Sequence, residues 1–184
     1  MPVRLRDLPT RSLTDPELAA LRALMDAAFG TDPEHGFADS DWEHALGGRH
    51  FVLEVDGDIV SHASVVERVL EIGGRPLRTG YVEAVATAPG MERRGHGSAV
   101  MTAANDHIRQ TYELGALGTG RHAFYERLGW ETWRGPVGVR MPDGERVHDP
   151  SEDGHVMVLR TPRSPAGLSI DAPIFVDWRP GNPW

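Results

Sequence analysis

The feature that most limits the possible folds is the run from Tyr81 to Val100, YVEAVATAPGMERRGHGSAV. It begins as an apolar strand containing one acid, Glu83, and ends in a glycine-rich, doubly basic turn that leads into helix-forming residues. The start of a helix leaves backbone N–H groups unpaired and carries a partial positive charge. Gly95 and Gly97 lack a Cβ, so the backbone there can approach a ligand closely. This order of strand, turn and helix predicts a phosphate cradle, with a plain surface turn as the alternative.

Two common phosphate-binding patterns do not fit this turn. No G-x-x-x-x-G-K-[ST] sequence is present, and a G-x-G-x-x-G pattern fails because Val100 stands at its third glycine. The turn therefore belongs to neither of these two classes.

Length and composition indicate one globular domain spanning residues 1–184. The 40% hydrophobic and 25% charged residues are ordinary for such a domain. No apolar run approaches the ~20 residues of a membrane span, and we expect neither a membrane association nor a signal peptide. The absence of cysteine excludes disulfides, cysteine-ligated zinc and a cysteine nucleophile, and it fits a cytoplasmic location.

The net charge of −8, from 19 basic and 27 acidic residues, argues against a nucleic-acid partner. An acidic surface could attract a cationic small molecule. It could equally serve only to keep the protein in solution.

Periodicity predicts two helices before the central strands. The first follows Thr14 and Glu17, which form a capping box, and places Leu18, Leu21, Met25 and Ala28/Phe29 on one face. The second begins with Ser40 and Glu43 as caps, has Asp41 in its first turn, and stops at Gly47-Gly48.

Extended segments are predicted at 50–56, 58–72 and 75–87, with a hairpin turn at Asp56-Gly57. Helices are expected at 98–113 and 121–129, and short strands at 114–119, 156–160 and 173–178. This order favours one α+β domain around a mixed, mostly antiparallel sheet flanked by helices.

At the glycine-rich turn the chain resembles the GNAT acetyltransferase superfamily. The coenzyme loop of that superfamily reads (Gln/Arg)-x-x-Gly-x-(Gly/Ala), and here the matching residues run from Glu92 to Gly97. Downstream, AFYERLGW resembles the second GNAT motif. The segments DWEHALGGRH, YVEAVA, YELGAL, FYERLGW and DWRPGNPW resemble the aminoglycoside 2′-N-acetyltransferases over most of the chain, most weakly before residue 40.

The resemblance implies that acetyl-CoA binds between splayed central strands and that an amine of the substrate attacks its thioester directly. The family pattern assigns the pantetheine arm to backbone groups of Val85, Ala86 and Thr87. The pyrophosphate falls to backbone groups of Glu92, Arg93, Arg94, Gly95, His96 and Gly97. Glu92 departs from the family's usual Gln or Arg, so it is assigned a backbone role only.

Two residues are candidates for proton transfer. An alkylammonium with a pKa of about 10 is mostly protonated at pH 7, so the attack needs a base. Glu83 lies next to the proposed coenzyme strand and is the candidate base, acting through a water. Tyr125 matches the family position of the general acid for the leaving thiolate. The residues alone favour a solvated strand acid for Glu83 and a core side chain for Tyr125, and the resemblance favours the catalytic roles.

A cationic aminoglycoside needs carboxylates and carbonyl groups around it. The resemblance points to Glu152, Asp153, Gly118, Ala84, Glu83, Trp178 and the terminal carboxylate of Trp184. Trp178 could instead pack in the core. A longer loop before the second helix offers Asp32, Glu34 or Asp39, and the sequence does not choose among them.

Other constellations are weaker. The histidines lack the HExxH spacing and the segment 148–155 is not an EF-hand loop, so we predict no metal site. Trp42, Trp130 and Trp133 are expected in the core or in groove walls. The alternatives to an aminoglycoside acetyltransferase are a GNAT enzyme for a polyamine or a cell-wall amino sugar, and a non-catalytic acyl-CoA-binding protein. Family members pair as homodimers, which makes a dimer the expectation.

Overall fold

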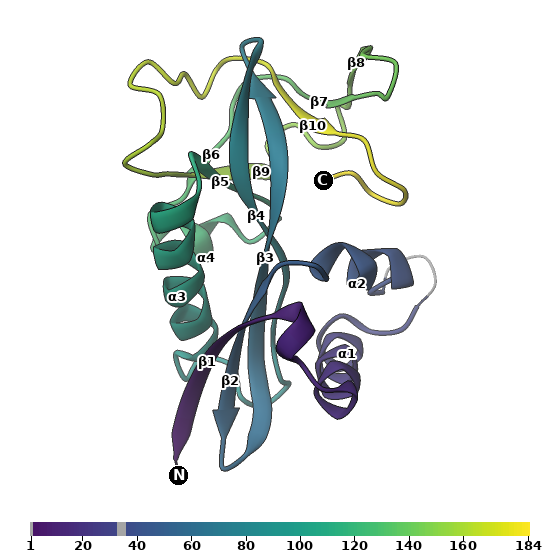
Figure 1. Ribbon diagram of the computed structural model, residues 1–184, viewed down its shortest axis with the longest axis vertical. Helices are drawn as coiled ribbons and strands as arrows, with labels where there is room; N and C mark the ends of the chain where they lie inside the picture. The colour runs from purple at the N-terminus through teal and green to yellow at the C-terminus, as the bar shows by residue number, and fades with distance from the viewer. Residues whose placement is uncertain (1, 33–35) are drawn as a thin grey trace. The chain divides into compact units, whose positions relative to one another are not determined.

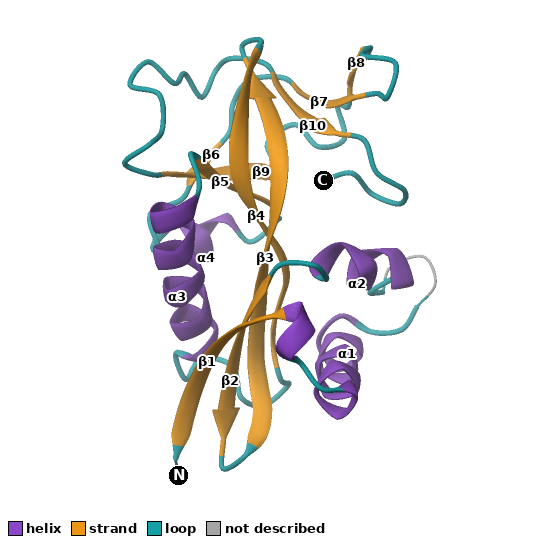
Figure 2. Ribbon diagram, in the orientation of Figure 1, coloured by secondary structure: helices purple, strands orange, loops and turns teal. Residues whose placement is uncertain are grey.

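The computed structural model describes residues 2–32 and 36–184 of the chain. Figures 1 and 2 show its helices and strands along the chain. The elements are β1 (Val3–Pro9), a 3-10 turn (Thr10–Ser12), α1 (Asp15–Phe29), α2 (Asp39–Ala45), β2 (Arg49–Val55), β3 (Asp58–Ile72), β4 (Arg75–Thr87), α3 (His96–Thr111), β5 (Leu114–Gly118), α4 (His122–Glu126), β6 (Glu131–Thr132), β7 (Val137–Arg140), β8 (Arg146–His148), β9 (Val156–Arg160) and β10 (Ile174–Asp177).

The chain groups into two compact units. The first unit contains Met1–Val66 and Val82–Ala104, and the second contains Glu67–Tyr81 and Asn105–Trp184. Strands β3 and β4 and helix α3 each contribute residues to both units, and the two long strands are prominent in Figure 1. The expected β3 and β4 ranges agree with the structure at both ends.

The first unit is built on an antiparallel set of strands. Strand β1 pairs with β2 from Val3 opposite Val55 to Pro9 opposite Arg49, and β2 pairs with β3. The predicted hairpin is confirmed. Asp56 and Gly57 join β2 to β3 with φ angles of 53° and 96°, the left-handed pair that a type I′ turn requires.

Helix α1 of the first unit begins with the predicted capping box. The backbone N–H of Thr14 donates to Glu17 Oε2 at 2.8 Å, and the N–H of Glu17 donates to Thr14 Oγ1 at 3.4 Å. Leu21 packs with a core cluster from β1 and β2, and Met25 packs with Ala86 of β4. The predicted apolar face is wrong at Ala28 and Phe29, which are exposed because the helix ends there. Phe29 stacks instead on Phe37, with ring centroids 5.7 Å apart.

Helix α2 begins two residues earlier than the sequence predicted, at Asp39 instead of Asp41. Its N-cap is Ala38, and the Asp41 carboxylate accepts the Ala38 N–H at 3.0 Å. The expected caps, Ser40 and Glu43, are therefore wrong. Asp41 lies at the third helical position, where its side chain can reach back to the N-cap backbone.

The second unit holds the sheet order β6-β9-β5-β4-β3-β10-β7-β8. The pairs β4–β5 and β10–β7 are parallel, and the other described pairs in this order are antiparallel. The described pairing of β4 with β5 covers Thr79 to Tyr81. The predicted mixed, mostly antiparallel sheet is therefore confirmed.

Large apolar side chains of β4, β5 and β9 fill the second unit, among them Leu77, Leu114 and Met157. The expected core positions of Trp130 and Trp133 are confirmed. The indole N–H of Trp130 donates to Asn105 Oδ1 at 3.0 Å, and that of Trp133 donates to the Ala172 carbonyl at 2.9 Å. Among the described residues, no helix is both long and apolar enough to cross a membrane.

Candidate active site

The glycine-rich turn of the first unit is folded tightly on itself. Arg93 and Gly95 adopt left-handed φ angles of 57° and 86°. The Glu92 carboxylate accepts the Gly90 N–H at 2.7 Å, and the Arg94 guanidinium donates to the Gly90 carbonyl at 3.1 Å. Both side chains are thus engaged within the turn, which agrees with a purely backbone role for Glu92.

The turn leads directly into helix α3. The Gly95 carbonyl accepts the first helical hydrogen bond, from the N–H of Ala99 at 2.9 Å. The N–H groups of His96, Gly97 and Ser98 therefore precede the first bonded donor of the helix, where intrahelical partners do not exist. Adjacent backbone donors at the positive end of a helix fit a diphosphate group, so the residues present suit the coenzyme that the family uses.

In β4, the residue that follows Glu83 breaks the regular strand. Ala84 has a φ of 50°, the left-handed region that residues with a Cβ rarely adopt. Side chains of β3 bind the carbonyl groups around it. Ser64 donates to the Glu83 carbonyl at 3.3 Å, His62 lies 2.8 Å from the Ala84 carbonyl, and Ser61 donates to the Ala86 carbonyl at 2.9 Å.

These contacts attach both the candidate base and the candidate coenzyme strand to side chains of β3. Glu83 is partly buried, as are Val85 and Thr87, while Ala86 packs against α1. The structure therefore places the carbonyls near Glu83 and Ala84 against β3, and it brings both residues next to the segment expected to hold the pantetheine arm.

Tyr125 belongs to the second unit, on the short helix α4. Its side chain is 7% exposed and meets Phe124 and Trp130 edge to face, at centroid distances of 4.9 and 6.2 Å. Burial raises the pKa of Tyr125 to about 12. The phenol therefore keeps its proton at neutral pH and can act as a donor.

Three of the predicted substrate residues meet in the second unit. A Cβ built on Gly118 would lie 3.7 Å from the carboxyl carbon of Trp184, the chain end, and 3.6 Å from the Tyr81 hydroxyl. Asn182 joins the same group, because its side chain accepts the Trp184 N–H at 3.0 Å and donates to Glu152 Oε1 at 3.5 Å. The structure thus connects Gly118, Glu152 and Trp184.

The electrostatics of this group favour a cation. Desolvation by burial raises the pKa of Glu152, although Asn182 offsets part of the shift. A cation placed beside a partly desolvated carboxylate would recover solvation lost on folding. Within the described residues, the buried indole N–H of Trp184 has no hydrogen-bond acceptor.

The C-terminal segment is held by Arg68, a residue that the sequence did not single out. Its side chain is only 5% exposed. The guanidinium donates to Asp177 Oδ1 at 3.2 Å and also to the carbonyls of Asp177 and Pro183. It lies 5.3 Å from the centroid of the Tyr81 ring. These partners are more than 100 positions away in sequence, so no local pattern could have indicated them.

The remaining acids are already engaged or lie elsewhere. Asp153 Oδ1 accepts the Val137 N–H at 2.9 Å, which lowers the pKa of this carboxyl. Asp39 is 92% exposed and pairs with Arg22 at 2.9 Å. Asp32 is exposed, and Glu34 lies outside the described residues. All four stay predictions as substrate contacts.

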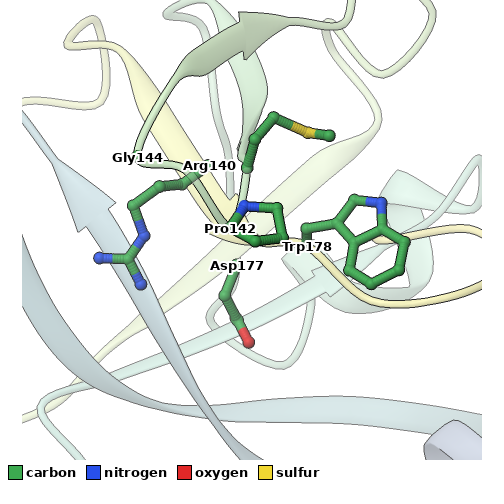
Figure 3. A pocket seen from close by; sticks show the side chains of 6 residues that line it. Arg140, Pro142, Gly144, Asp177 and Trp178 are labelled. Atoms are coloured by element: carbon green, nitrogen blue, oxygen red, sulfur yellow. The ribbon is translucent and has the colours of Figure 1, made fainter.

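Trp178 lines an open pocket of about 410 Å³ in the second unit (Figure 3). The other lining residues are Arg140, Met141, Pro142, Gly144 and Asp177. The indole is 46% exposed, so the alternative of core packing is wrong for Trp178. Its part in substrate binding stays a prediction. Residues 2–32 and 36–184 contain no group of three or more side chains suited to hold a metal ion.

Comparisons with known proteins agree with this geometry. A family model described as an acetyltransferase (GNAT) domain matches residues 9–133. An aminoglycoside 2′-N-acetyltransferase from Mycolicibacterium fortuitum is 42% identical over 155 residues, which cover 82% of this chain and 78% of that protein.

Solved structures show the same fold at low identity. A GNAT family N-acetyltransferase from Escherichia coli in complex with CoA aligns with a TM-score of 0.66 and 16% identity, over 96% of this chain and 89% of that one. A GCN5-related N-acetyltransferase from Kribbella flavida aligns with a TM-score of 0.58 and 22% identity. That match covers 71% of this chain but 34% of the longer Kribbella chain.

The resemblance predicted from the sequence is confirmed. The matched family segment includes the glycine-rich turn and Tyr125, and the relative from Mycolicibacterium extends the likeness over most of both chains. On these grounds the chain belongs to the GNAT acetyltransferase family.

Proposed function

We propose that this protein transfers the acetyl group of acetyl-CoA to the 2′-amino group of aminoglycosides. An acetyl-CoA-dependent N-acetyl transfer follows from membership of the family. The single observation that carries the choice of substrate is the 42% identity to an aminoglycoside 2′-N-acetyltransferase over most of both chains. The partly desolvated carboxyl of Glu152, linked through Asn182 to Trp184, supports the same choice.

Backbone groups of the first unit hold the coenzyme. The N–H groups at the start of α3, together with those of the turn from Glu92 to Gly95, bind the diphosphate, and the β4 segment from Val85 to Thr87 binds the pantetheine arm. Bound acetyl-CoA supplies an activated acetyl thioester and leaves as CoA. The left-handed Arg93 and Gly95 support this arrangement, because left-handed residues in a turn are typical of backbone sites that bind anions.

Glu83 acts as the base. The 2′-ammonium must lose a proton before its nitrogen can attack, and a positioned base contributes roughly 10²–10⁴-fold to such a step. The Glu83 backbone is held by Ser64, and its side chain is partly buried at the edge of the left-handed Ala84. We assign the proton transfer to the Glu83 carboxylate through an intervening water.

Tyr125 donates a hydrogen bond, and then a proton, to the departing sulfur. The pKa of about 12 keeps this phenol protonated across the neutral range. A buried donor also competes less with water for its acceptor. The assignment of Glu83 and Tyr125 to one reaction comes from the family pattern, and each residue is supported by its own surroundings.

The substrate is held by charge. An ammonium about 4 Å from a carboxylate gains ~1 kcal/mol in bulk water and ~4 kcal/mol at an effective dielectric of 20. Partly desolvated groups therefore decide affinity. Glu152 and the Trp184 carboxylate supply negative charge in our proposal.

Purified protein tests the proposal directly. Release of CoA is measured with acetyl-CoA and an aminoglycoside that has a 2′-amino group, against a matched aminoglycoside with a 2′-hydroxyl. We expect turnover of the first and none at that position of the second, with the acetylated nitrogen located by NMR. A kcat/KM higher with spermidine or glucosamine than with the aminoglycoside would show that the substrate is a different amine. If the protein binds the coenzyme but turns over none of these amines, it is a non-catalytic acyl-CoA-binding protein.

We further propose that the chain acts as a single domain over residues 1–184, as a homodimer and in the cytoplasm. Continuity of β3, β4 and α3 through both units supports the single domain, because neither unit holds these elements whole. A single calorimetric unfolding transition is expected. Sedimentation equilibrium at twice the monomer mass of 20.2 kDa tests the dimer.

A further inference from the structure

A line of buried polar side chains ends at the irregular residue of β4. Thr10 Oγ1 lies 2.7 Å from His50 Nε2, His50 Nδ1 lies 2.9 Å from His62 Nε2, and His62 Nδ1 lies 2.8 Å from the Ala84 carbonyl. Both imidazole rings are fully buried. The line joins the 3-10 turn, β2, β3 and β4 of the first unit, and the proposed reaction uses none of its side chains.

The last acceptor sets the direction of every hydrogen bond in the line. A carbonyl oxygen can only accept, so His62 donates through Nδ1–H to Ala84 and keeps a lone pair on Nε2. His50 must then donate from Nδ1–H to that lone pair and accept at Nε2 from the Thr10 hydroxyl. Thr10 in turn accepts the Gly47 N–H at 2.9 Å. Two neutral rings in the same tautomer satisfy all four ring nitrogens. The Thr10 hydroxyl has one proton, which His50 Nε2 at 2.7 Å and the Gly48 carbonyl at 3.3 Å share as acceptors.

The surroundings keep both rings neutral. Desolvation lowers the pKa of His50 to about 4 and that of His62 to about 3, where the neighbouring His50 adds to the effect. Among the described residues, the hydrogen bonds from the pair to other groups go to the Thr10 hydroxyl and the Ala84 carbonyl, neither of which carries charge. The rings therefore form a fixed set of dipoles across the neutral range.

The position at which the line ends matters for the reaction. A left-handed residue redirects a strand, because the regular alternation of side chains requires extended φ angles on both sides. At Ala84 this change of direction separates Glu83 from the segment Val85 to Thr87. The angle at which the Glu83 carboxylate leaves β4 therefore depends on how firmly Ala84 is held. Among the β3 side chains that bind these carbonyls, His62 is itself held by a hydrogen bond to the His50 ring.

We propose that the His50–His62 pair positions the candidate base, by holding Ala84 in its left-handed conformation through a directed line of neutral hydrogen bonds. His62 is a positioning residue, since it acts through the backbone of Ala84. The inference rests on the proposed function of Glu83.

Two substitutions at position 62 separate positioning from simple packing. His62→Asn keeps an N–H donor near the place of Nδ1, whereas His62→Leu has similar bulk and no donor. We expect kcat per folded molecule to fall at least ten-fold in His62→Leu and to return to within three-fold of wild type in His62→Asn. The KM for acetyl-CoA should change less than three-fold in both. Equal kcat in His62→Leu and wild type would overturn the proposal.

Thr10→Val removes the far end of the line together with the hydroxyl's contacts to the Gly47 N–H and the Gly48 carbonyl, and it tests the proposal even where His62→Leu does not fold. A two- to five-fold loss of kcat is expected. An unchanged kcat would contradict the proposal that Thr10 and His50 help His62 to hold Ala84. Thr79→Val is the matched control. It removes a buried strand hydroxyl that donates to the Leu77 carbonyl at 3.0 Å, so it should lower the melting temperature and leave kcat unchanged.

NMR of protein labelled with ¹⁵N-histidine tests the line without any substrate. Both buried rings should show a protonated Nδ1 and an unprotonated Nε2 from pH 8 down to pH 5. An Nε2–H tautomer, or titration near pH 6.5, would overturn the assignment. Failure of wild-type turnover would instead refute the proposed function, while the tautomers would still report on the line itself.

Discussion

In the first unit the groups suited to an anion are backbone N–H groups at the start of α3, whereas in the second unit the groups suited to a cation are carboxylates. The difference follows from the chemistry of the peptide. Its backbone offers donors with partial positive charge but no group with a full negative charge. A glycine-rich turn can therefore hold a diphosphate with few side chains. Neutralising an ammonium takes the full negative charge of a side-chain acid such as Glu152.

The buried polar side chains of the two units also differ in charge. His50 and His62 of the first unit are neutral and bind one another, while Arg68 of the second unit is charged and binds three oxygens of the C-terminal segment. Both arrangements meet the requirement that buried polar groups find partners. The first needs no counter-ion, whereas the second keeps its charge because Asp177 and two carbonyls surround it.

The largest effect that would sharpen this comparison is expected from Tyr125→Phe. If the second unit supplies the proton and the first unit binds the coenzyme, kcat should fall by about 10²-fold or more, since a positioned acid contributes 10²–10⁴-fold. The dissociation constant for CoA, measured by calorimetry, should stay within about two-fold of wild type. Tyr112→Phe is the matched control, because Tyr112 is also 7% exposed, and it should leave kcat unchanged. If Tyr125→Phe lost coenzyme affinity together with kcat, proton donation and coenzyme binding would not be separate roles of the two units.

Arg68→Ala should release the chain end of the second unit. Hydrogen bonds to a charged group are worth roughly 1.5–3 kcal/mol each when their partner is removed, so the tail should lose its fixed position. We expect the KM for the aminoglycoside to rise about ten-fold, with the KM for acetyl-CoA little changed. Arg146→Ala is the control, since it also breaks an ion pair, at 2.6 Å to the buried Glu71. It should lower stability without this change in KM, and an equal rise in both variants would argue against a role for the tail.

The neutral histidine pair predicts a pH dependence of stability in the first unit. Unfolded histidine has a pKa near 6.5, while His50 and His62 titrate at about 4 and about 3 in the folded chain. Between these values the unfolded state binds more protons. The stability is thus fully present above about pH 6.5 and is lost as the pH falls through 4.

Denaturant titrations measured from pH 7 to pH 4 should therefore show a loss of a few kcal/mol, and His62→Asn should show a shallower slope over the same range. Glu17, whose pKa is lowered to about 2 by the Thr14 N–H and Arg6, contributes a loss in the same direction at lower pH. Identical slopes in wild type and His62→Asn would show that His62 is not neutral and buried.

Gly95→Ala should have the smallest effect. The left-handed φ of 86° costs a residue with a Cβ roughly 1–2 kcal/mol, and part of this cost should appear as weaker coenzyme binding. We expect a rise of about five-fold in the CoA dissociation constant. Gly57→Ala imposes similar strain in the β2–β3 hairpin, at a φ of 96°, and should reduce stability alone. Equal CoA affinity in the two variants would contradict a backbone grip on the diphosphate.

Features governed by neighbours in sequence could be predicted well. The capping box at Thr14 and Glu17, the hairpin at Asp56-Gly57 and the limits of β3 and β4 depend on groups within a few residues of one another. The start of α2 was missed because Asp41, rather than Ser40, reaches the free N–H of Ala38. Several side chains there compete for one cap, and a residue pattern alone does not rank them.

The site residues also differ in whether their neighbours in sequence could reveal them. The glycine-rich turn was recognisable because its function lies in consecutive backbone groups. Arg68 and Asn182 gave no signal, since their importance comes from partners on distant segments. The left-handed conformation of Ala84 was also invisible, because alanine is ordinarily found in regular structure and only its neighbours in β3 explain the exception.

The amino-acid sequence alone determined the central strands β2 to β4 and the helices α1 to α4 in their order, the anion-binding turn and the family, because these depend on local backbone preferences and on contiguous motifs. The tertiary structure alone decided that His50 and His62 meet beneath Ala84, that Arg68 holds the C-terminal segment, and that Gly118, Glu152 and Trp184 share one cluster. The physical reason is that hydrogen bonds between distant segments depend on the register of the whole sheet, which no short window of sequence contains.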